Sequence, residues 1–186
     1  MNIAPLSLGH DRATDGRIAR AWAALEGVPD PEIPVVSIRD LGILRDIATG
    51  PDGALEVLIT PTYSGCPAMS QIAEDIGQAL DAAGLAPWRI RTVLSPAWTT
   101  DWITPAARER LREFGITPPG QCGPPAAAQP LSFVPRAARA GAPDTVACPR
   151  CGSVHTQEIS RFASTACKAL YRCLDCREPF DYFKPY

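Results

Sequence analysis

The sequence predicts an α/β (α+β) fold in three parts: a small N-terminal domain with a mixed sheet over residues 1–117, a linker over 118–145, and a C-terminal β zinc ribbon over 146–186. Three observations lead to this prediction. Helical apolar patterns alternate with short apolar runs in the first part, which is typical of small α/β domains. The middle part is rich in Pro, Ala and Gly and holds only three charged residues. Four of the seven cysteines fall in two Cys-x-x-Cys pairs near the C-terminus.

The N-terminal domain is expected to hold three helices and several short strands. The first two expected helices carry their apolar residues on one face, and Gly84 and Gly115 are stop signals for the second and third helices. The turn Pro51-Asp52-Gly53 separates two strands. In chain order, the expected elements are a helix over 14–26, short strands over 35–36 and 43–48, a strand over 54–60, a helix over 68–83, a strand over 88–94 and a helix over 105–114. This segment is long enough to bury one hydrophobic core.

The linker over 118–145 cannot bury a core of its own, because it is dominated by Pro, Ala and Gly. Its prolines favour extended, partly polyproline II conformations. We therefore expect it to let the two flanking modules orient independently.

Composition limits the classes of function. The chain of 186 residues has a formal net charge of −2, so it lacks an overall basic field for non-specific nucleic-acid binding. No apolar run approaches the roughly 18 residues needed to span a bilayer. The first residues also lack the apolar segment of a signal peptide. We therefore expect a cytoplasmic protein, in which paired cysteines indicate metal binding rather than disulfides.

The paired cysteines have the spacing of a tetrahedral metal site. Cys148 and Cys151 form the first pair, and Cys173 and Cys176 form the second, 21 residues later. Each pair lets two thiolates of one tight turn reach the same ion, at about 2.3 Å per bond. The residues around them suit strands over 154–160, 169–172 and 180–183. Structural Zn²⁺ is the expected ion because a closed four-thiolate site stabilises so small a module. Iron held as in rubredoxin uses the same ligands and is the alternative.

A fifth cysteine, Cys66, is predicted at the N-terminus of the second helix. The free amides and the positive end of the helix dipole would favour its thiolate, the form that binds metals. Pro67 suits the first helical turn. The alternative is a buried cysteine that only packs, which is usual for this residue.

Cys167 lies outside both pairs, next to Lys168. A neighbouring lysine lowers the pKa of a thiol and makes it more reactive. A small residue that is buried or half-buried is the simpler interpretation.

Two stretches of the first domain carry a resemblance to a known family. The segments DPEIPVVSIRDLGI and TPTYSGCP resemble the small domain of iron–sulfur cluster assembly and carrier-adaptor proteins. Joined to the C-terminal stretch CPRCGSVHTQEISRFASTACKALYRCLDC, they resemble a family of accessory components of the bacterial phenylacetyl-CoA epoxidase, the multicomponent oxygenase of aerobic phenylacetate degradation. The resemblance singles out Asp30, Glu32 and Cys66, the four paired cysteines and the stretch SRFASTACKALYRC.

The resemblance implies an indirect role. In that complex, other subunits hold the di-iron site, the structural partner and the flavin and iron–sulfur reductase. The accessory component is implied to be a non-catalytic maturation factor that delivers iron or a cluster, held transiently by Cys66, Asp30 and Glu32. Its implied partners are the oxygenase and reductase subunits and the iron–sulfur assembly machinery. The sequence agrees, because it has neither a Glu-x-x-His di-iron pattern nor a glycine fingerprint for flavin or nicotinamide.

Two other functions use the same residues. The four-cysteine site could hold iron and transfer electrons like rubredoxin. The ribbon could instead bind nucleic acid, because it holds several basic and aromatic side chains. These are Arg150, Arg161, Lys168, Arg172, Arg177, Phe162, Tyr171, Phe180 and Tyr182. Against nucleic acid, the small positive charge of the module is offset by the −2 of a zinc ion with four thiolates.

Overall fold

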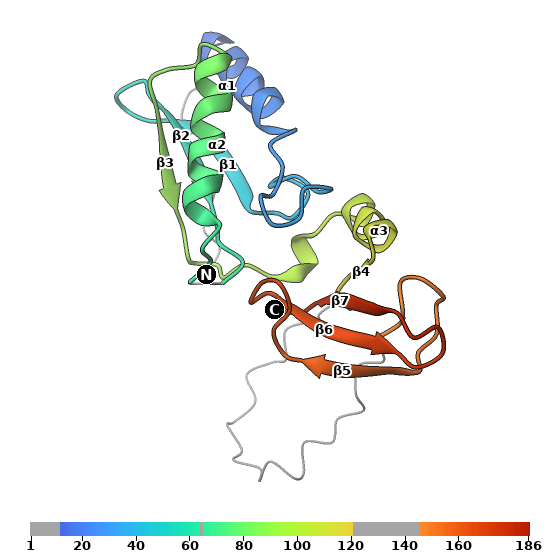
Figure 1. Cartoon of the computed structure of the whole chain (residues 1–186). Coiled ribbons are helices and arrows are strands. Elements are labelled where there is room, and N and C mark those ends of the chain that lie inside the picture. The colour runs from blue at the N-terminus through green and yellow to red at the C-terminus, as the bar shows by residue number, and fades with distance from the viewer. Residues whose placement is uncertain (1–11, 64, 121–145) are drawn as a thin grey trace, which may run out of the picture.

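The structure is a computed structural model that describes residues 12–63, 65–120 and 146–186. Figure 1 shows a body of helices and sheet at the N-terminal side and a β-ribbon at the C-terminal side, with a short helix between them. The α+β fold class that the sequence predicts is confirmed. Most of the predicted linker lies outside the described residues. None of the described helices is long and apolar enough to cross a membrane.

The N-terminal body is a mixed three-stranded sheet covered by two helices. Its elements are α1 (Arg12–Leu25), β1 (Leu44–Thr49), β2 (Leu55–Ile59), α2 (Met69–Ala82) and β3 (Trp88–Thr92). The strand order is β1-β2-β3, with β1 antiparallel and β3 parallel to β2. The crossover α2 makes the parallel pair possible, and it contacts both α1 and β3.

The segment before β1 differs from the prediction. Val35 and Val36 form no strand; they lie in a loop closed by a single bridge between Pro29 and Ser37. The loop is held by Asp30, whose Oδ1 accepts hydrogen bonds from the amides of Glu32 and Ile33. Such local side-chain bonds compete with strand pairing. The loop has an apolar residue at Val36 because this side chain is buried in the core, where it is 2% exposed.

A short connecting unit joins the two bodies. It consists of the 3₁₀ turn η1 (Thr100–Trp102), the helix α3 (Pro105–Phe114) and the two-residue strand β4 (Ile116–Thr117). The Thr104 hydroxyl accepts the amide of Ala107 at the start of α3, and Gly115 ends it with a φ of 96°. The helix therefore has the bounds that its cap residues predict.

The ribbon has four strands, one more than the sequence predicts. Its strands β5 (Thr156–Ser160), β6 (Lys168–Cys173) and β7 (Pro179–Phe183) form an antiparallel meander. β4 adds to β7 in parallel, so the end of the N-terminal segment completes the C-terminal sheet. A two-residue strand has no periodicity by which sequence could reveal it.

The two modules share a hydrophobic core. Cys167 and Phe183 of the ribbon belong to the same buried cluster as the helices and sheet of the N-terminal body. The rings of Phe183 and Trp98 lie 6.0 Å apart, and the C-terminus lies at this junction (Figure 1). The expected independent orientation of the modules is therefore wrong, because buried apolar side chains of both modules pack in one core.

Phe183→Ala is expected to lower the free energy of unfolding by about 3–5 kcal/mol, because it leaves a cavity in this shared core. Phe183 is 1% exposed, whereas Phe114 on α3 is 51% exposed and provides the matched control. Phe114→Ala is expected to change stability by no more than about 0.5 kcal/mol. Chemical denaturation measures both; equal effects of the two variants would contradict a shared core.

A four-cysteine cluster and a thiol–carboxylate site

The four paired cysteines meet at one end of the ribbon. The Sγ atoms of Cys148 and Cys176 lie 3.7 Å apart, and those of Cys151 and Cys173 lie 3.6 Å apart. All four sulfur atoms lie within 4.8 Å of one another. A tetrahedral ion with bonds of about 2.3 Å needs sulfur–sulfur distances of about 3.8 Å. The cluster thus has the dimensions of a closed tetrahedral metal site.

The backbone of each cysteine turn is set by a residue in the left-handed region. Gly152 has a φ of 75° and Arg177 a φ of 69°, and each directly follows the second cysteine of its pair. In the second turn, the amide of Cys176 lies 3.5 Å from the sulfur of Cys173. This amide lowers the pKa of the Cys173 thiol to about 7 in the metal-free ribbon. The backbone therefore favours a thiolate at Cys173, whereas the neighbouring sulfur atoms raise the pKa of the Cys176 thiol to about 12.

The surroundings of the cluster join its two turns. His155 is not part of the four-cysteine group, and its Nδ1 atom lies 3.2 Å from Oδ1 of Asp175. Asp175 also accepts a hydrogen bond from the hydroxyl of Ser153. The Asp175 carboxylate in the second cysteine turn thus binds Ser153 and His155, which follow the first cysteine turn.

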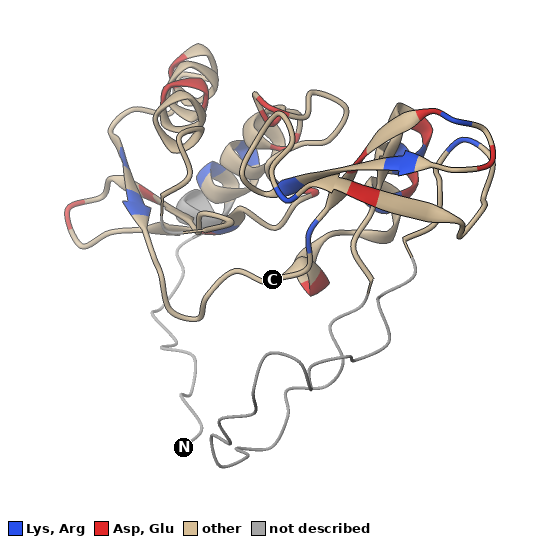
Figure 2. Cartoon of the chain, turned by 60° about the horizontal axis from the view of Figure 1, so that its bottom comes forward, with Lys and Arg blue, Asp and Glu red and all other residues tan. Residues whose placement is uncertain are grey.

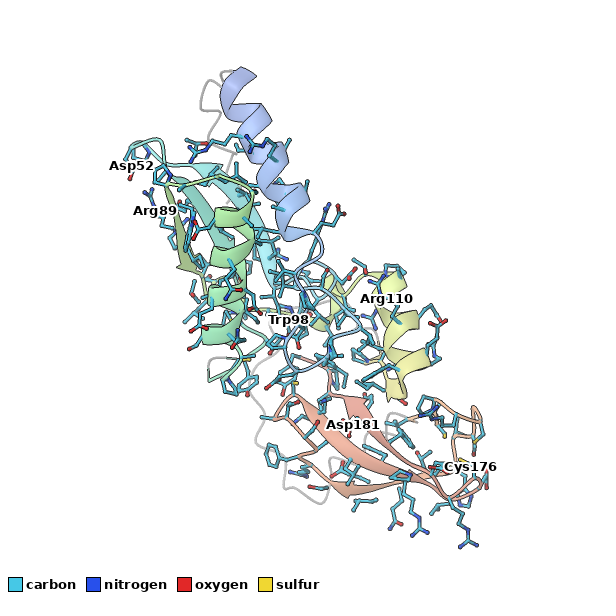
Figure 3. The ribbon with its side chains drawn as sticks, turned by 45° about the horizontal axis from the view of Figure 1, so that its top comes forward. Asp52, Arg89, Trp98, Arg110, Cys176 and Asp181 are labelled. Carbon is cyan, nitrogen blue, oxygen red and sulfur yellow. The ribbon has the colours of Figure 1, made fainter. Side chains whose placement is uncertain are left out.

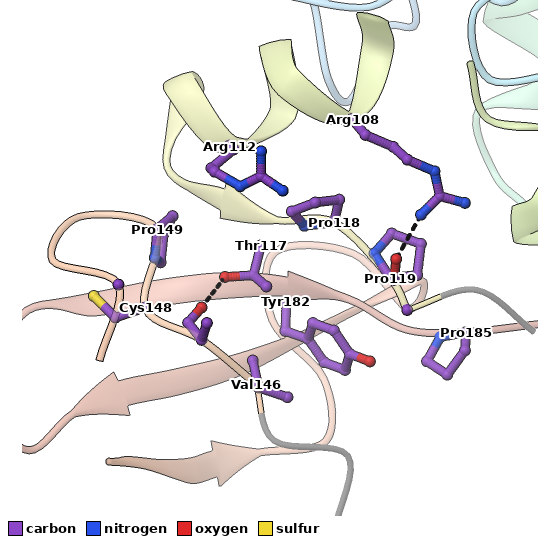
Figure 4. Close-up of a pocket in the computed structure, with 13 residues that line it drawn as sticks. Arg108, Arg112, Thr117, Pro118, Pro119, Val146, Cys148, Pro149, Tyr182 and Pro185 are labelled. Atoms are coloured by element: carbon purple, nitrogen blue, oxygen red, sulfur yellow. Dashed lines mark hydrogen bonds between the residues drawn. The ribbon is translucent and has the colours of Figure 1, made fainter. Parts of the chain in front are cut away.

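A pocket of about 530 Å³ separates α3 and β4 from the first cysteine turn. Figure 4 shows two hydrogen bonds at this pocket. The bond from Thr117 Oγ1 to the carbonyl of Ala147, at 2.7 Å, crosses to the first cysteine turn, whereas the bond from Arg108 to the carbonyl of Pro119, at 2.5 Å, stays on the side of α3 and β4. The bond from Thr117 thus attaches β4 to Ala147, the residue that directly precedes Cys148. The pocket borders on residues 120 and 146, where the described part of the chain stops and resumes.

The ribbon carries both positive and negative side chains. Figure 2 shows basic and acidic residues interspersed along its strands. Lys168 pairs with Asp181 at 3.3 Å, and Arg161 lies 3.9 Å from Glu158. Nucleic-acid binding depends on basic groups that are available to phosphates, so these ion pairs weigh against that alternative.

Cys66 lies in the loop between β2 and α2 and packs against the shared hydrophobic core. Figure 3 shows Cys176 at the end of the ribbon that lies away from Trp98, which packs at the junction of the two modules. Helix α2 begins at Met69 with Ala68 as its N-cap. Cys66 and Pro67 therefore precede the helix, and Pro67 is not in the first helical turn. Cys66 is half-buried, and its amide donates to the carbonyl of Tyr63 at 3.1 Å.

The expectation that the helix dipole favours the Cys66 thiolate is wrong for the metal-free protein. Burial raises the pKa of the Cys66 thiol above its ordinary value, and the charges of Glu32 and Asp30 raise it further. Hydrogen bonds from the amide of Ala68 and the hydroxyl of Thr62 oppose this shift without reversing it. The helix begins too late to offset the burial.

Asp30 and Glu32 share the environment of Cys66. Asp30 is 5% exposed, and its Oδ1 accepts the amides of Glu32 at 2.9 Å and Ile33 at 2.8 Å. Burial raises the pKa of both carboxyls, and the charge of Asp30 adds to the shift of Glu32. The thiol and the two carboxyls thus all have raised pKa values. A bound cation would stabilise their deprotonated forms.

This group is more open than the four-cysteine cluster. Within the part of the chain that the structure describes, the paired cysteines are the one group of three or more ligands with all ligand atoms within 4.8 Å. The ligand atoms of Cys66, Asp30 and Glu32 are spread more widely. The structure thus brings together the three residues that the resemblance singles out, without closing them around an ion.

Sequence reasoning missed that Cys167 and Lys168 come close to the carboxyls of Asp30 and Glu32. Lys168 is the first residue of β6 and Cys167 directly precedes it, and both are 4% exposed. Burial raises the pKa of the Cys167 thiol, with contributions from Glu32 and Asp30 that the ammonium of Lys168 opposes. No local signal relates residues 30 and 167, because only the packing of the ribbon on the N-terminal body makes them neighbours.

The raised pKa of Cys66 predicts slow alkylation near neutral pH in the iron-free protein. The rate should increase as the pH rises towards and beyond 9, the ordinary thiol value, because the thiolate is the nucleophile. Glu32→Gln removes a negative charge that raises this pKa, so it should speed alkylation at fixed pH. Mass spectrometry after iodoacetamide treatment measures the rate at Cys66. Glu26→Gln, which changes an exposed carboxylate paired with Arg39, is the control and should have no effect. A slower reaction in Glu32→Gln would contradict this account.

Comparison with known proteins adds to these observations. Residues 18–87 match the family described as iron–sulfur cluster assembly protein, and residues 133–184 match the PaaD zinc beta ribbon domain. A protein of Escherichia coli (strain K12), provisionally named as a subunit of 1,2-phenylacetyl-CoA epoxidase, is 49% identical over 90% of this chain and 93% of its own length. An Fe-S protein maturation auxiliary factor of Porphyromonas gingivalis is 34% identical over 50% of this chain and 85% of its own. A crystal structure of a DUF59 domain of unknown function from Bacillus anthracis, 26% identical, covers 53% of this chain and 94% of its own with a TM-score of 0.48.

Proposed function

The chain belongs to the same family as the Escherichia coli protein named as a subunit of 1,2-phenylacetyl-CoA epoxidase, and from this premise we propose that it is a maturation protein of that complex. In this proposal it has an accessory, non-catalytic role in phenylacetate degradation and assists the insertion of iron or an iron–sulfur cluster into other subunits. The similarity of its first half to maturation auxiliary factors supports the iron–sulfur part of the role.

The observation that supports the proposal is that Asp30 and Glu32 lie close enough to Cys66 for their charges to raise the pKa of its thiol. Thiolates suit iron and iron–sulfur clusters, and carboxylates suit harder ions such as ferrous iron. Iron or a cluster is the cargo here, so the site has to release what it binds. A site whose ligands do not close around the ion is suited to such transfer.

The four-cysteine cluster has a different task in this proposal. Its sulfur–sulfur distances of 3.6 and 3.7 Å fit a tetrahedral ion, and four protein ligands leave no open position for chemistry. We assign it structural Zn²⁺, held by Cys148, Cys151, Cys173 and Cys176. Electron transfer as in rubredoxin needs iron in this cluster, which would give the purified protein a visible colour that zinc does not.

The partners in this proposal are the oxygenase and reductase subunits of the complex and the iron–sulfur assembly machinery that supplies the cargo. The experiment is to produce the other subunits with and without this chain and to measure the iron and sulfide of each. We expect at least one subunit to be under-loaded when the chain is absent. Adding the chain after maturation should not change the turnover of a fully loaded complex. Full loading of every subunit in its absence would refute a maturation role.

A further inference from the structure

We infer that an uncharged pocket beside the Cys66 loop is the place where a client subunit docks, by inserting one large apolar side chain that is flanked by acidic groups of the client. The inference rests on the proposed function and adds to it the surface that receives the partner. It leaves the ligands of the iron as they are proposed above.

The pocket has a volume of about 320 Å³ and is formed by both modules. It is lined by residues 60–63 directly after β2, by Leu94, Ala97 and Trp98 after β3, and by Tyr186 at the end of the ribbon. None of these residues is an acid, a lysine or an arginine. The volume lies at the lower end of the range for binding pockets in proteins, which suits a single large side chain.

Two apolar residues at this pocket are exposed to solvent. Leu94 is 62% exposed and Tyr186 is 40% exposed, whereas Trp98 is only 5% exposed. The rings of Trp98 and Tyr186 lie 6.2 Å apart, and Nε1 of Trp98 donates to the carbonyl of Leu41 at 2.9 Å. The pocket thus combines a buried tryptophan, held by a hydrogen bond, with exposed apolar side chains. This combination is typical of sites that bury an anchoring side chain of a partner protein.

The backbone attaches this pocket to the loop that carries Cys66. Tyr63 lines the pocket, and its carbonyl accepts the amide of Cys66 at 3.1 Å. A partner whose side chain fills the pocket therefore lies against the Cys66 loop. Transfer of iron requires donor and receiver to approach the same ion, so a client gains from docking here rather than on a distant face of the chain.

The ribbon extends this surface with an exposed aromatic ring. Phe162 is 65% exposed, and Nζ of Lys184 lies 4.7 Å from the centre of its ring. The amide and Nζ of Lys184 and the hydroxyl of Tyr186 donate to carbonyls of the loop over 161–167, at 3.0, 3.2 and 3.4 Å. These bonds hold the loop against the C-terminal segment that reaches the pocket. Aromatic residues next to basic ones are the composition of protein-binding surfaces.

The charge of this surface points to the kind of partner. Its segments contain two basic residues, Arg161 and Lys184, and no Asp or Glu; they are residues 60–63, 93–98, 161–167 and 184–186. Glu158 lies 3.9 Å from Arg161, outside these segments. The charge of Glu32 acts on Tyr63, but in the proposed function the bound iron offsets it.

An iron-free client complements such a surface. It receives iron with thiolates or carboxylates, which are negative before the ion arrives. A second copy of this chain complements it poorly, because a twofold dimer would bring the two basic surfaces face to face. The partner is therefore a client subunit with an apolar side chain beside its acidic iron ligands.

The test measures the binding of the full chain, with zinc bound, to each iron-free oxygenase and reductase subunit. Leu94→Asp should weaken binding to the subunit that the chain matures by at least about tenfold, because it places a charge in the pocket. Phe114→Asp is the matched control, since Phe114 is 51% exposed on α3, and it should bind like the unmodified chain. Zinc content and thermal unfolding curves verify that both variants fold.

A second pair of variants tests the charge of the partner. Arg161→Gln should lower the association rate at low salt by about twofold or more, because charges at the edge of an interface act mainly on association. Arg172→Gln changes another exposed arginine of the ribbon and should leave the rate unchanged. Equal rates for the two variants would overturn the acidic character of the partner.

The outcomes separate the docking surface from the proposed function. Cys66→Ser should bind the client like the unmodified chain, because it removes an iron ligand and leaves the pocket intact. Equal binding by Leu94→Asp and the unmodified chain would overturn the docking surface, as would a dimer of this chain that Leu94→Asp dissociates. Neither result affects the role of Cys66. Full iron loading in cells that lack the chain would instead overturn the proposed function.

Discussion

Cys173→Ser is expected to reduce bound zinc from about one ion per chain to nearly none and to unfold the ribbon. Cys173 is completely buried, and its sulfur lies 3.6 Å from that of Cys151. Besides its four-cysteine cluster, the ribbon has only a small core of its own. Structural zinc contributes about 10–16 kcal/mol in comparable small modules, far more than such a core can replace. Metal analysis of the purified variant measures the zinc.

The loss should also reach the N-terminal body, because Phe183 and Cys167 belong to its buried cluster. Limited proteolysis should therefore cut Cys173→Ser first in the ribbon, and denaturation should show a less stable first module. Cys122→Ser is the matched control and should keep its zinc and its protease resistance. A metal-free Cys173→Ser protein with a protease-resistant C-terminal module would refute a structural role of zinc.

Cys66→Ser is expected to leave folding and zinc content unchanged and to abolish most of the maturation activity. Cys66 is half-buried in a loop before α2, and serine has nearly its size, so the core is preserved. Serine offers no thiolate, and the loss of a soft ligand should reduce the delivery of iron by about tenfold or more. Epoxidation by subunits produced together with the variant measures this loss. Adding the variant to a complex matured by the unmodified protein should change nothing.

The sequence predicts those elements that local residues determine. Thr104 and Gly115 fix the ends of α3, and the spacing of the paired cysteines predicts the cluster of sulfur atoms. The fold class, the zinc ribbon and the family resemblance are confirmed. Each of these depends on caps, periodicity or motif spacing within one short segment.

The features that sequence analysis missed or misjudged depend on contacts between distant segments. β4 is too short to be recognised and forms because β7 offers it an edge. Val35 and Val36 resemble a strand but belong to a loop that Asp30 holds. The pKa of Cys66 is raised because burial and two carboxylates outweigh the start of a helix. The position of Cys167 follows from the packing of the two modules, which no local pattern encodes.

The most direct test of the central claim is the iron content of the subunits that the chain matures. They are to be isolated from cells that make the unmodified protein, Cys66→Ser, Cys122→Ser or no form of the chain, and the iron per polypeptide is to be measured. The account predicts full loading with the unmodified protein and with Cys122→Ser. It predicts a loss with Cys66→Ser as large as the loss without the chain. Full loading with a folded, zinc-containing Cys66→Ser protein would contradict the claim that Cys66 handles iron.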